Sequence, residues 1–396
     1  MNLNPSPAGR VFCCIKGCFV EMEFSKKDKF YMQKALRLAK KGEGFTSPNP
    51  LVGAVVVKDG EIVGEGYHQY YGGPHAEVYA LDEAGKMARG STIYVTLEPC
   101  SHHGKTPPCS LKIINSGVKR VVAAMQDPNP EVAGRGFKMM KDKGIEVEVG
   151  LLEKEAKKLN EIFLKYITSD NPFIILKSAQ TIDGYLATST GNSKWVTGEK
   201  ARLYGHQLRH KVDGILVGIN TVLSDDPSLT ARPENIVGKD PLRIILDSKL
   251  KTPKDAKIII QNSEAKTLIV HGDQVNAAKK KFYEKKENVE LLSLKINENG
   301  NIPLKRLLKK LHKRKISSIL IEGGGKVNHS FLKEKLVDKF YNFIAPKYFG
   351  GNDGITVFDG DGPLKMEDAI KIKDYEMEKV GKDFLIKGYR KKEGDI

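Results

Sequence analysis

Hydrophobic positions follow two alternating patterns through the first part of the chain. A stripe formed by Met32, Ala35, Leu36 and Ala39 has helical spacing and predicts a helix over residues 29–41. Short apolar runs bounded by turn residues instead predict buried strands at 51–57, 92–96 and 118–124. Further helices are predicted from near residue 75 to 84 and over 154–166. This alternation indicates helices packed on a mostly parallel sheet.

A turn-rich stretch at 168–172 divides the chain, and the pattern of buried strands then starts again. The strands predicted beyond it are 173–177, 214–217, 242–246, 267–270, 316–321 and 340–345. A chain of 396 residues is too long for one ordinary core, so two domains are expected. We therefore predict a leader without fixed structure at 1–21, an α/β domain at 22–170 and a second α/β domain at 171–396.

One cluster of motifs combines a histidine, a glutamate and two cysteines at short spacings. Glu77 follows His75 by two positions, and Cys100 and Cys109 come after the strand at 92–96. One imidazole and two thiolates suit zinc and leave a fourth tetrahedral position for water, whose pKa zinc lowers to about 7. Glu77 is close enough to carry protons without binding the metal. This is the arrangement of the zinc nucleobase deaminases, whose signature is H-x-E followed by P-C and another cysteine.

Two features of this cluster leave alternatives open. Nucleic-acid-editing deaminases space their cysteines as C-x-x-C, whereas eight residues separate Cys100 from Cys109. His102 and His103 lie between them and are chemically able to act as ligands instead. The alternative without a metal is a buried histidine with two buried thiols. It has to be considered because single motif matches can arise without the function.

Local structure is expected to bring the three proposed ligands together. The predicted helix begins near His75, and Pro99 suits the first turn of another helix that follows the strand at 92–96. Two helix starts beside one buried strand would place their first residues close to each other. The cluster would then lie at the end of that strand.

A second candidate site lies at a run of three glycines. Glu322 directly follows the strand at 316–321, and Gly323-Gly324-Gly325 precede a helix predicted over 327–336. Glycines let the backbone approach a phosphate closely, and a helix N-terminus adds unpaired amides and partial positive charge. A triple glycine can equally be only a turn. No G-x-G-x-x-G follows the first strand of this domain, so an ordinary dinucleotide fingerprint is excluded.

These motifs together resemble the bifunctional deaminase/reductases of riboflavin biosynthesis, and the resemblance covers residues 22–390. In the first half the matching motifs are 48–53 (PNPLVG), 96–100 (TLEPC), 107–109 (PPC), 126–130 (QDPNP) and 134–136 (GRG). In the second half they are 181–184 (TIDG), 193–197 (SKWVT), 225–227 (DDP) and 322–325 (EGGG). The resemblance implies a cytidine-deaminase-like α/β/α domain followed by a dihydrofolate-reductase-like α/β domain.

The same resemblance implies the site residues. One zinc ion per chain would be bound by His75, Cys100 and Cys109, with Glu77 as the catalytic residue and Asn49, His68 and Lys105 as deaminase substrate contacts. NADPH would contact Ala179, Trp195, Thr221, Asp225, Ser248, Gly324, Gly325, Lys326, Val327, Asn328, His329 and Ser330. The reductase substrate would contact Lys177, Ser193, Arg209, Leu229, Arg232 and Glu322.

The implied function is two successive reactions on one phosphorylated pyrimidine. Zinc-dependent hydrolysis would deaminate 2,5-diamino-6-(5-phosphoribosylamino)pyrimidin-4-one. NADPH would then reduce the ribosyl group to ribityl, giving 5-amino-6-(5-phosphoribitylamino)uracil. Arg209 and Arg232 suit a sugar phosphate, and Lys177 could polarise the ribose carbonyl or imine. Trp195, the single tryptophan, could contact the nicotinamide or simply anchor the core.

Composition changes this picture little. The net charge of +16 invites a nucleic-acid interpretation, but the lysines are scattered over predicted helix faces. A basic surface equally attracts a phosphorylated substrate and a dinucleotide, so no nucleic-acid partner is expected. Five cysteines argue against a disulfide framework, and thiolate ligands fit a reducing cytoplasm. No apolar run approaches the ~20 residues of a membrane span, and we expect a cytoplasmic homo-oligomer without membrane partners.

Two other function classes compete with this hypothesis. The positive charge motivates a deaminase of tRNA or single-stranded nucleic acid, against which the long cysteine insert and the second domain argue. A degenerate partner protein that keeps only the fold is the non-enzyme alternative. The complete set of His75, Glu77, Cys100 and Cys109 argues against that alternative.

Overall fold

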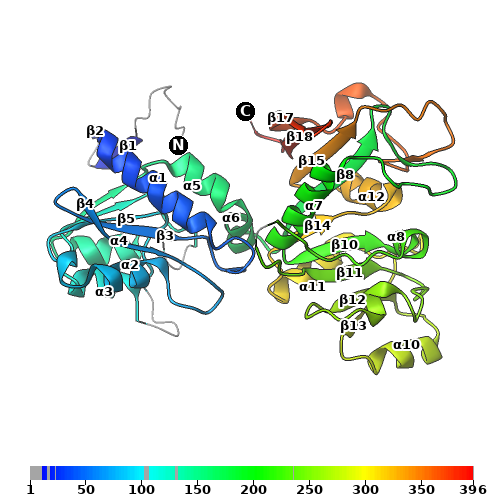
Figure 1. The fold of residues 1–396 in the computed structure, drawn as a ribbon, viewed down its shortest axis with the longest axis horizontal. Helices are drawn as coiled ribbons and strands as arrows, with labels where there is room; N and C mark the ends of the chain where they lie inside the picture. Colours follow the sequence, from blue (N-terminus) through cyan, green and yellow to red (C-terminus); the bar gives the residue numbers. More distant parts are fainter. Residues whose placement is uncertain are drawn as a thin grey trace. The chain divides into compact units, whose positions relative to one another are not determined.

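Figure 1 shows the computed structural model, which describes residues 11–15, 18–22, 24–101, 107–129, 133–234 and 236–395. The chain divides into two compact units, Met1–Thr168 and Ser169–Ile396. Strand β1 (Val11–Ile15) pairs antiparallel with β2 (Cys18–Met22). All residues of the two strands except Met22 belong to the segment predicted to lack fixed structure. The other residues of that predicted leader lie outside the described ranges.

The first unit contains a five-stranded sheet in the order β4-β3-β5-β6-β7. Its strands are β3 (Gly53–Lys58), β4 (Glu61–Tyr67), β5 (Thr92–Val95), β6 (Arg120–Ala123) and β7 (Glu146–Val149). Strands β5, β6 and β7 are parallel, but β3 is antiparallel to both of its neighbours. The prediction of a mostly parallel sheet is wrong at this edge, because Asp59 and Gly60 adopt φ of 51° and 88° and turn β3 directly back into β4.

Helices cover both faces of this sheet. They are α1 (Lys26–Lys40), α2 (Ala76–Ala84), η1 (Gly85–Ala88), α3 (Cys109–Asn115), α4 (Arg135–Lys141), α5 (Glu153–Leu159) and α6 (Glu161–Thr168). A Cβ at Gly53 would lie 2.0 Å from the Ala35 carbonyl oxygen of α1, and one at Gly66 would lie 2.2 Å from the Ala76 oxygen of α2. Gly66 pairs with Ala54, the neighbour of Gly53, and successive strand residues face opposite sides. Helices α1 and α2 therefore pack on opposite faces, at distances that only glycine permits.

Helix α1 begins three residues before the predicted start because Ser25 and Asp28 form a capping box. Asp28 is buried and also accepts hydrogen bonds from the Tyr94 hydroxyl and from Arg120 Nη1, both at 2.7 Å. Arg120 in turn donates to Glu148 at 3.1 and 2.8 Å. Burial alone would raise the pKa of Asp28, but these hydrogen bonds, that of Arg120 above all, hold it well below its ordinary value.

The helix predicted over 154–166 is two helices, α5 and α6, which meet at Asn160. The Asn160 side chain accepts a hydrogen bond from the Leu51 amide at 2.8 Å and donates to the Leu51 carbonyl at 3.0 Å. This two-way bond fixes a distant backbone segment to the junction. Periodicity could not reveal it, because the partner lies 109 residues away.

The second unit contains a nine-stranded sheet in the order β13-β12-β11-β10-β14-β8-β15-β18-β17. Its strands are β8 (Phe173–Thr181), β10 (Gly214–Gly218), β11 (Leu242–Leu246), β12 (Thr267–Gly272), β13 (Val289–Leu294), β14 (Ser318–Ile321), β15 (Lys339–Ala345), β17 (Ile372–Val380) and β18 (Asp383–Arg390). The strands from β13 to β15 run parallel, and β18 and β17 are added antiparallel. Strands β9 (Tyr185–Ala187) and β16 (Ile355–Thr356) pair separately.

The helices of this unit are α7 (Glu199–Lys211), α8 (Ile219–Asp225), α9 (Lys257–Ile260), α10 (Ala277–Glu284), α11 (Leu304–Lys313), α12 (Gly325–Lys333) and η2 (Met366–Asp368). Strands β10 and β14 are buried along their whole length, as the apolar runs predict. Strand β17 was not predicted, because most of its side chains are exposed and its sequence has no apolar face. Within the described ranges, no helix combines the length and the apolar character needed to cross a membrane.

Replacing Asp28 by Asn is expected to lower the free energy of unfolding by roughly 2–3 kcal/mol, because Arg120 loses a charged acceptor. The native carboxyl has a lowered pKa, so its contribution is complete above the pKa of the unfolded chain and fades as the pH falls towards the native value. Urea unfolding at several pH values, followed by circular dichroism, measures both effects. Glu61→Gln, at an exposed strand end, is the control, and equal stability of the two variants at neutral pH would contradict this role.

Candidate active sites

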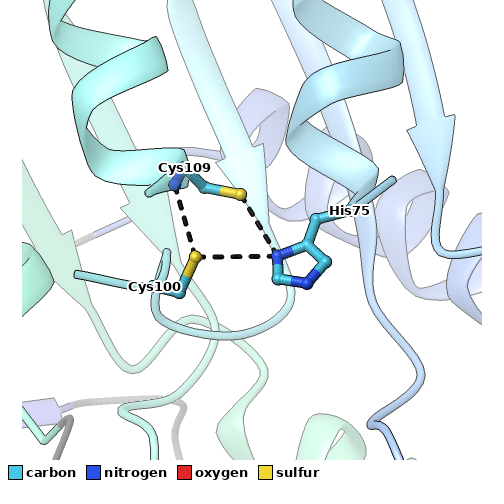
Figure 2. Close-up of side chains that lie close together, drawn as sticks. All are labelled: His75, Cys100 and Cys109. Atoms are coloured by element: carbon cyan, nitrogen blue, oxygen red, sulfur yellow. Dashed lines mark hydrogen bonds between the residues drawn. The ribbon is translucent and has the colours of Figure 1, made fainter. Parts of the chain in front are cut away.

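His75, Cys100 and Cys109 meet at one point of the first unit, as Figure 2 shows. The Nδ1 atom of His75 lies 3.6 Å from Cys100 Sγ and 3.3 Å from Cys109 Sγ. Zinc bonds of ~2.3 Å to sulfur and ~2.0 Å to nitrogen, at tetrahedral angles, separate sulfur from nitrogen by about 3.5 Å. The spacing and the chemistry of this donor set therefore fit a zinc ion.

The two sulfur atoms differ in their surroundings. The Cys109 amide donates a hydrogen bond to Cys100 Sγ at 3.3 Å. Hydrogen bonds from Cys109 and His75 lower the pKa of the Cys100 thiol, against the opposing effect of burial. The shared bond with Cys100 and burial raise the pKa of Cys109. Cys100 is therefore stabilised as a thiolate, the form that binds metal.

Two helix starts carry ligands, but the second is not the predicted one. His75 is the N-cap of α2, and Cys109 is the first residue of α3, directly after Pro108. Pro99 was expected in the first turn of a helix, but it lies with Cys100 in a segment without regular secondary structure. That prediction is wrong because Pro108, which lacks an amide hydrogen, occupies the helix start instead.

Glu77 lies in the first turn of α2 and is only 3% exposed. Its Oε2 atom is buried and has no hydrogen-bond partner within the described part of the chain. Burial raises the pKa of Glu77 to about 7, although the nearby His75 acts in the opposite direction. A carboxyl group that titrates near neutrality can both accept and release a proton.

Glu98 fixes the segment that carries Cys100, a role that was not predicted. Its buried carboxylate accepts backbone hydrogen bonds from Asp127, Gly134 and Gly136 at 3.2, 2.9 and 3.0 Å. These residues belong to the matched motifs 126–130 and 134–136, so one side chain joins three of the motifs quoted above. An acidic residue inside a buried apolar segment was the available signal.

His68 determines which end of the Asn49 amide is free. His68 Nδ1 lies 2.9 Å from the Pro74 carbonyl, which can only accept, so Nδ1 carries the proton. Burial lowers the pKa of His68, and the neutral ring accepts at Nε2 from Asn49 Nδ2 at 3.1 Å. Asn49 is then left with its Oδ1 atom as an acceptor. Lys105 and the two rival histidines of its loop lie outside the described residues.

The second unit holds a cavity of about 1360 Å³ at the carboxyl edge of its parallel strands. Of the predicted cofactor contacts, it is lined by Ala179, Trp195, Thr221, Asp225, Ser248, Gly324, Gly325, Lys326, Val327, His329 and Ser330. Of the predicted substrate contacts, it is lined by Lys177, Ser193, Arg209, Leu229, Arg232 and Glu322. Asn328 is not among the lining residues, because it is fully buried and donates to the Val357 carbonyl at 3.0 Å. The volume exceeds that of a typical pocket for one small ligand, which is roughly 300–1,000 Å³.

An ion-pair cluster forms the polar wall of this cavity. Arg209 Nε and Nη2 both donate to the Glu322 carboxylate at 2.9 Å, and Lys177 Nζ lies 3.8 Å from it. Burial alone would raise the pKa of Glu322, but the charges of Arg209 and Lys177 lower it to about 2. Arg209 also donates from Nη1 to the Thr230 carbonyl at 3.0 Å. Most of its guanidinium is thus used within the protein, whereas Arg232 is exposed at the cavity.

The alternative that Trp195 anchors the core is wrong, because the side chain is 63% exposed and lines the cavity. Arg202 stacks over its ring at 4.3 Å from the centroid. Arg202 and His206 also line the cavity and were not predicted. Both lie on α7 with Arg209, and the three-residue spacing of His206 and Arg209 was the available sequence signal.

Two glycines of the run differ in the space around them, since Gly324 has room for a side chain and Gly325 does not. Helix α12 begins at Gly325, two residues before the predicted start, with Gly324 as its N-cap. A Cβ at Gly324 would meet Thr221 Oγ1 at 3.9 Å, an ordinary contact. A Cβ at Gly325 would lie 2.5 Å from the Thr356 carbonyl oxygen. Gly325 is therefore required by packing. Gly324 can be substituted without a clash, so a substitution there can test whether a ligand lies beside it.

Comparison with known proteins matches each unit to a known family of domains. The family model of the cytidine and deoxycytidylate deaminase zinc-binding region matches residues 25–125, and that of the RibD C-terminal domain matches residues 172–386. Riboflavin biosynthesis protein RibD of Aquifex aeolicus is 48% identical, with 91% of this chain and 97% of the relative covered. The RibD protein of Escherichia coli K12 is 42% identical, with 91% and 98% covered.

Solved structures extend this likeness to the fold. Acinetobacter baumannii RibD is 38% identical with a TM-score of 0.83, covering 93% of this chain and 99% of that one. A diaminohydroxyphosphoribosylaminopyrimidine deaminase/5-amino-6-(5-phosphoribosylamino)uracil reductase of Thermotoga maritima is 40% identical with a TM-score of 0.80, covering 92% and 99%. These matches confirm the predicted fold class, a cytidine-deaminase-like α/β/α domain followed by a dihydrofolate-reductase-like α/β domain. The chain belongs to the RibD family of bifunctional riboflavin-biosynthesis enzymes, which join a zinc-binding deaminase domain to a reductase domain.

Proposed function

We propose that the first unit deaminates 2,5-diamino-6-(5-phosphoribosylamino)pyrimidin-4-one and that the second reduces the product to 5-amino-6-(5-phosphoribitylamino)uracil with NADPH. The observation that carries this proposal is the pair of complete sites on one chain. One site joins His75, Cys100 and Cys109 to a buried carboxyl group, and the other joins a large cavity to a cluster of ionised side chains. The family assignment gives the order of the two reactions.

In the deaminase site, His75, Cys100 and Cys109 would bind zinc, and Glu77 would carry the protons. When zinc is bound, the chemistry it supplies is activation of water near neutral pH. Glu77 would take up the proton released by that water and deliver it to the ring nitrogen. It would then take a second proton from the hydroxyl group added to the ring and deliver it to the amino group, which leaves as ammonia. Its raised pKa suits both transfers, and its unpartnered Oε2 is the atom available for them.

Asn49 and His68 would orient the pyrimidine. His68 holds the Asn49 amide nitrogen, so Asn49 offers Oδ1 to an N–H group of the substrate. Such an acceptor favours a ring edge that carries hydrogen-bond donors, as a diaminopyrimidinone does. Lys105 is proposed as a further contact, on the family resemblance alone.

In the reductase site, NADPH supplies a hydride, and the protein residues bind and orient the sugar. The exposed guanidinium of Arg232 would bind the phosphate, since it has no ion pair within the described residues. Lys177 would donate a hydrogen bond to the sugar oxygen that gains a proton as the hydride reaches C1′. Glu322 holds Lys177 and Arg209 in place, and Trp195 would contact the nicotinamide.

Two finer statements belong to this proposal. A reducing cytoplasm is proposed as the location, because the Cys100 and Cys109 thiolates must stay reduced to bind metal. A homo-oligomer is proposed because β17 is an edge strand that exposes Tyr375 and Met377 by 62% and 67%. Light scattering of the purified chain measures the oligomeric state.

The decisive experiment for the function is product analysis by mass. Purified protein is incubated with the diaminopyrimidinone phosphate, with and without NADPH. Deamination alone is expected without NADPH, and the ribityl product with it. A salt-sensitive shift of RNA without any turnover would favour the nucleic-acid deaminase, and absence of both reactions would favour the degenerate partner protein.

Zinc content tests the ligand assignment. Wild-type protein is expected to hold one zinc ion per chain, and Cys100→Ser is expected to retain a small fraction of it, because a serine hydroxyl is a poor zinc ligand at neutral pH. Elemental analysis of the purified proteins measures this directly. Full zinc occupancy in Cys100→Ser would reject Cys100 as a ligand.

Glu77→Gln tests the proton carrier. The amide keeps the shape of the pocket but cannot accept a proton, so deamination is expected to fall ~100- to 10,000-fold. Reduction of pre-deaminated substrate and the zinc content are expected to stay unchanged. Loss of both reactions in a folded, zinc-replete Glu77→Gln would contradict two independent sites.

Gly324→Glu tests the cofactor position. The backbone at Gly324 is extended and a side chain has space, so the variant is expected to fold, while its carboxylate would repel a dinucleotide phosphate. The Michaelis constant for NADPH is expected to rise by at least about tenfold, which corresponds to ~1.4 kcal/mol. Gly362→Glu, in open space on the surface, is the matched control. An unchanged Michaelis constant for NADPH in Gly324→Glu would contradict a cofactor phosphate beside Gly324.

A further inference from the structure

His206 is a cavity residue to which neither the sequence nor the family motifs gave a role. It lies on α7 and lines the cavity of the second unit. Arg209 follows three positions later, so the two side chains project from the same face of the helix. The question is what His206 can bind there.

The contacts of His206 determine which ring nitrogen is free. Its Nδ1 atom lies 3.1 Å from the Thr230 carbonyl, to which Arg209 Nη1 also donates at 3.0 Å. A carbonyl oxygen only accepts, so the proton is on Nδ1. Burial and the charges of Arg209 and Arg232 lower the pKa of His206, so the ring is neutral at pH 7 and Nε2 carries a lone pair. Among the described residues, no group donates to that Nε2.

The neighbouring groups on this wall are mostly donors. Lys177, Arg209 and Arg232 are permanently or predominantly cationic, and they carry donors without acceptors. Glu322 has acceptors, but Arg209 occupies both of its oxygen atoms at 2.9 Å. His206 Nε2 is therefore an acceptor that the protein leaves unused in surroundings rich in donors.

A chain of contacts connects this acceptor to residues assigned to both ends of the substrate. Lys177 lies beside Glu322, Glu322 binds Arg209, and Arg209 shares the Thr230 carbonyl with His206. Arg232 comes two residues after Thr230 in the same loop. His206 is thus linked through Arg209 and Glu322 to Lys177, assigned to the C1′ end of the sugar, and it is close enough to Arg232, assigned to the phosphate, for that charge to act on its ring. The groups of a ribosyl phosphate that lie between those ends are hydroxyls.

We propose that Nε2 of His206 accepts a hydrogen bond from the 2′ or 3′ hydroxyl of the substrate sugar, so that the reductase selects a hydroxylated sugar phosphate. The proposal rests on the proposed reductase function and adds a residue that determines its specificity. The oxygen of a hydroxyl group among cationic donors accepts hydrogen bonds from them, but its hydrogen has no acceptor. His206 Nε2 would provide that acceptor. A deoxy sugar would leave Nε2 desolvated and unpaired.

Two substitutions separate recognition from structure. His206→Asn keeps an N–H group for the Thr230 carbonyl, in place of Nδ1, but has no atom at the Nε2 position. His206→Gln reaches the Nε2 position with an amide that can accept. Lys200→Ala, on the exposed side of the same helix, is the control.

The measurement is steady-state reduction of 5-amino-6-(5-phosphoribosylamino)uracil and of its 2′-deoxy and 3′-deoxy analogues by the full chain. His206→Asn is expected to raise the Michaelis constant for the substrate about ten- to a hundredfold, with little change in kcat or in the constant for NADPH. His206→Gln is expected to recover most of this loss, and Lys200→Ala to behave as wild type. Wild type is expected to discriminate against one deoxy analogue, and His206→Asn is expected to lose that discrimination.

Equal substrate constants in wild type and His206→Asn, or the same deoxy discrimination in both, would overturn the role of His206 while leaving the reductase function intact. A failure of the wild type to reduce any of the three compounds with NADPH would instead reject the proposed function. Thermal unfolding of each variant shows whether the fold is retained. If His206→Asn does not fold, His206→Gln against wild type still decides, because a tenfold loss there would contradict an acceptor role.

Discussion

The free-energy cost of burying a carboxylate constrains both units of this protein. An ionised carboxyl group removed from water is costly unless several donors replace its hydration. Each unit has such a group just beyond a buried parallel strand, Glu98 after β5 and Glu322 after β14. Backbone amides surround the first, and the Arg209 guanidinium with the Lys177 ammonium surrounds the second. Segments distant in sequence must converge to supply these donors, and their convergence forms each site.

Surroundings give chemically identical side chains different tasks. Glu77 and Glu322 are both glutamates with little exposure at a site, 3% for Glu77 and 11% for the Glu322 side chain. The pKa of Glu77 is nevertheless raised to about 7 and that of Glu322 is lowered to about 2. The difference follows from their partners. Glu77 has an oxygen without a hydrogen bond among the described groups, so burial dominates and a proton can come and go. Glu322 is held by two cations, so it stays ionised and acts as a fixed anchor for the cavity wall. Histidine shows the same principle, since carbonyl groups fix the protonated nitrogen of both His68 and His206.

Much of this architecture could be predicted from the sequence, because its signals are local. The buried parallel strands β10 and β14 are continuous apolar runs, and the ligands His75, Cys100 and Cys109 stand in short motifs of distinctive composition. Nearly all of the reductase residues that the resemblance named do line the cavity. The sequence did not show strand β17, whose exposed residues lack an apolar face, or the antiparallel pairing of β3 with β5. Nor did it show that Asn160 divides a helix by binding Leu51.

The sequence by itself determined the family, the types of residue at each site and the order of the two domains, because motifs and hydrophobic runs are properties of neighbouring residues. Only the tertiary structure decided how those residues act. The second helix that carries a ligand begins at Cys109 and not near Pro99. Arg209 is bound to Glu322, whereas Arg232 is exposed and can bind a phosphate. The Asn328 side chain is buried in the core. The tertiary structure also set the ionisation of Glu77 and left one nitrogen of His206 unused. Burial, hydrogen bonding and charge at these positions come from residues far apart in the chain, so no local pattern could specify them.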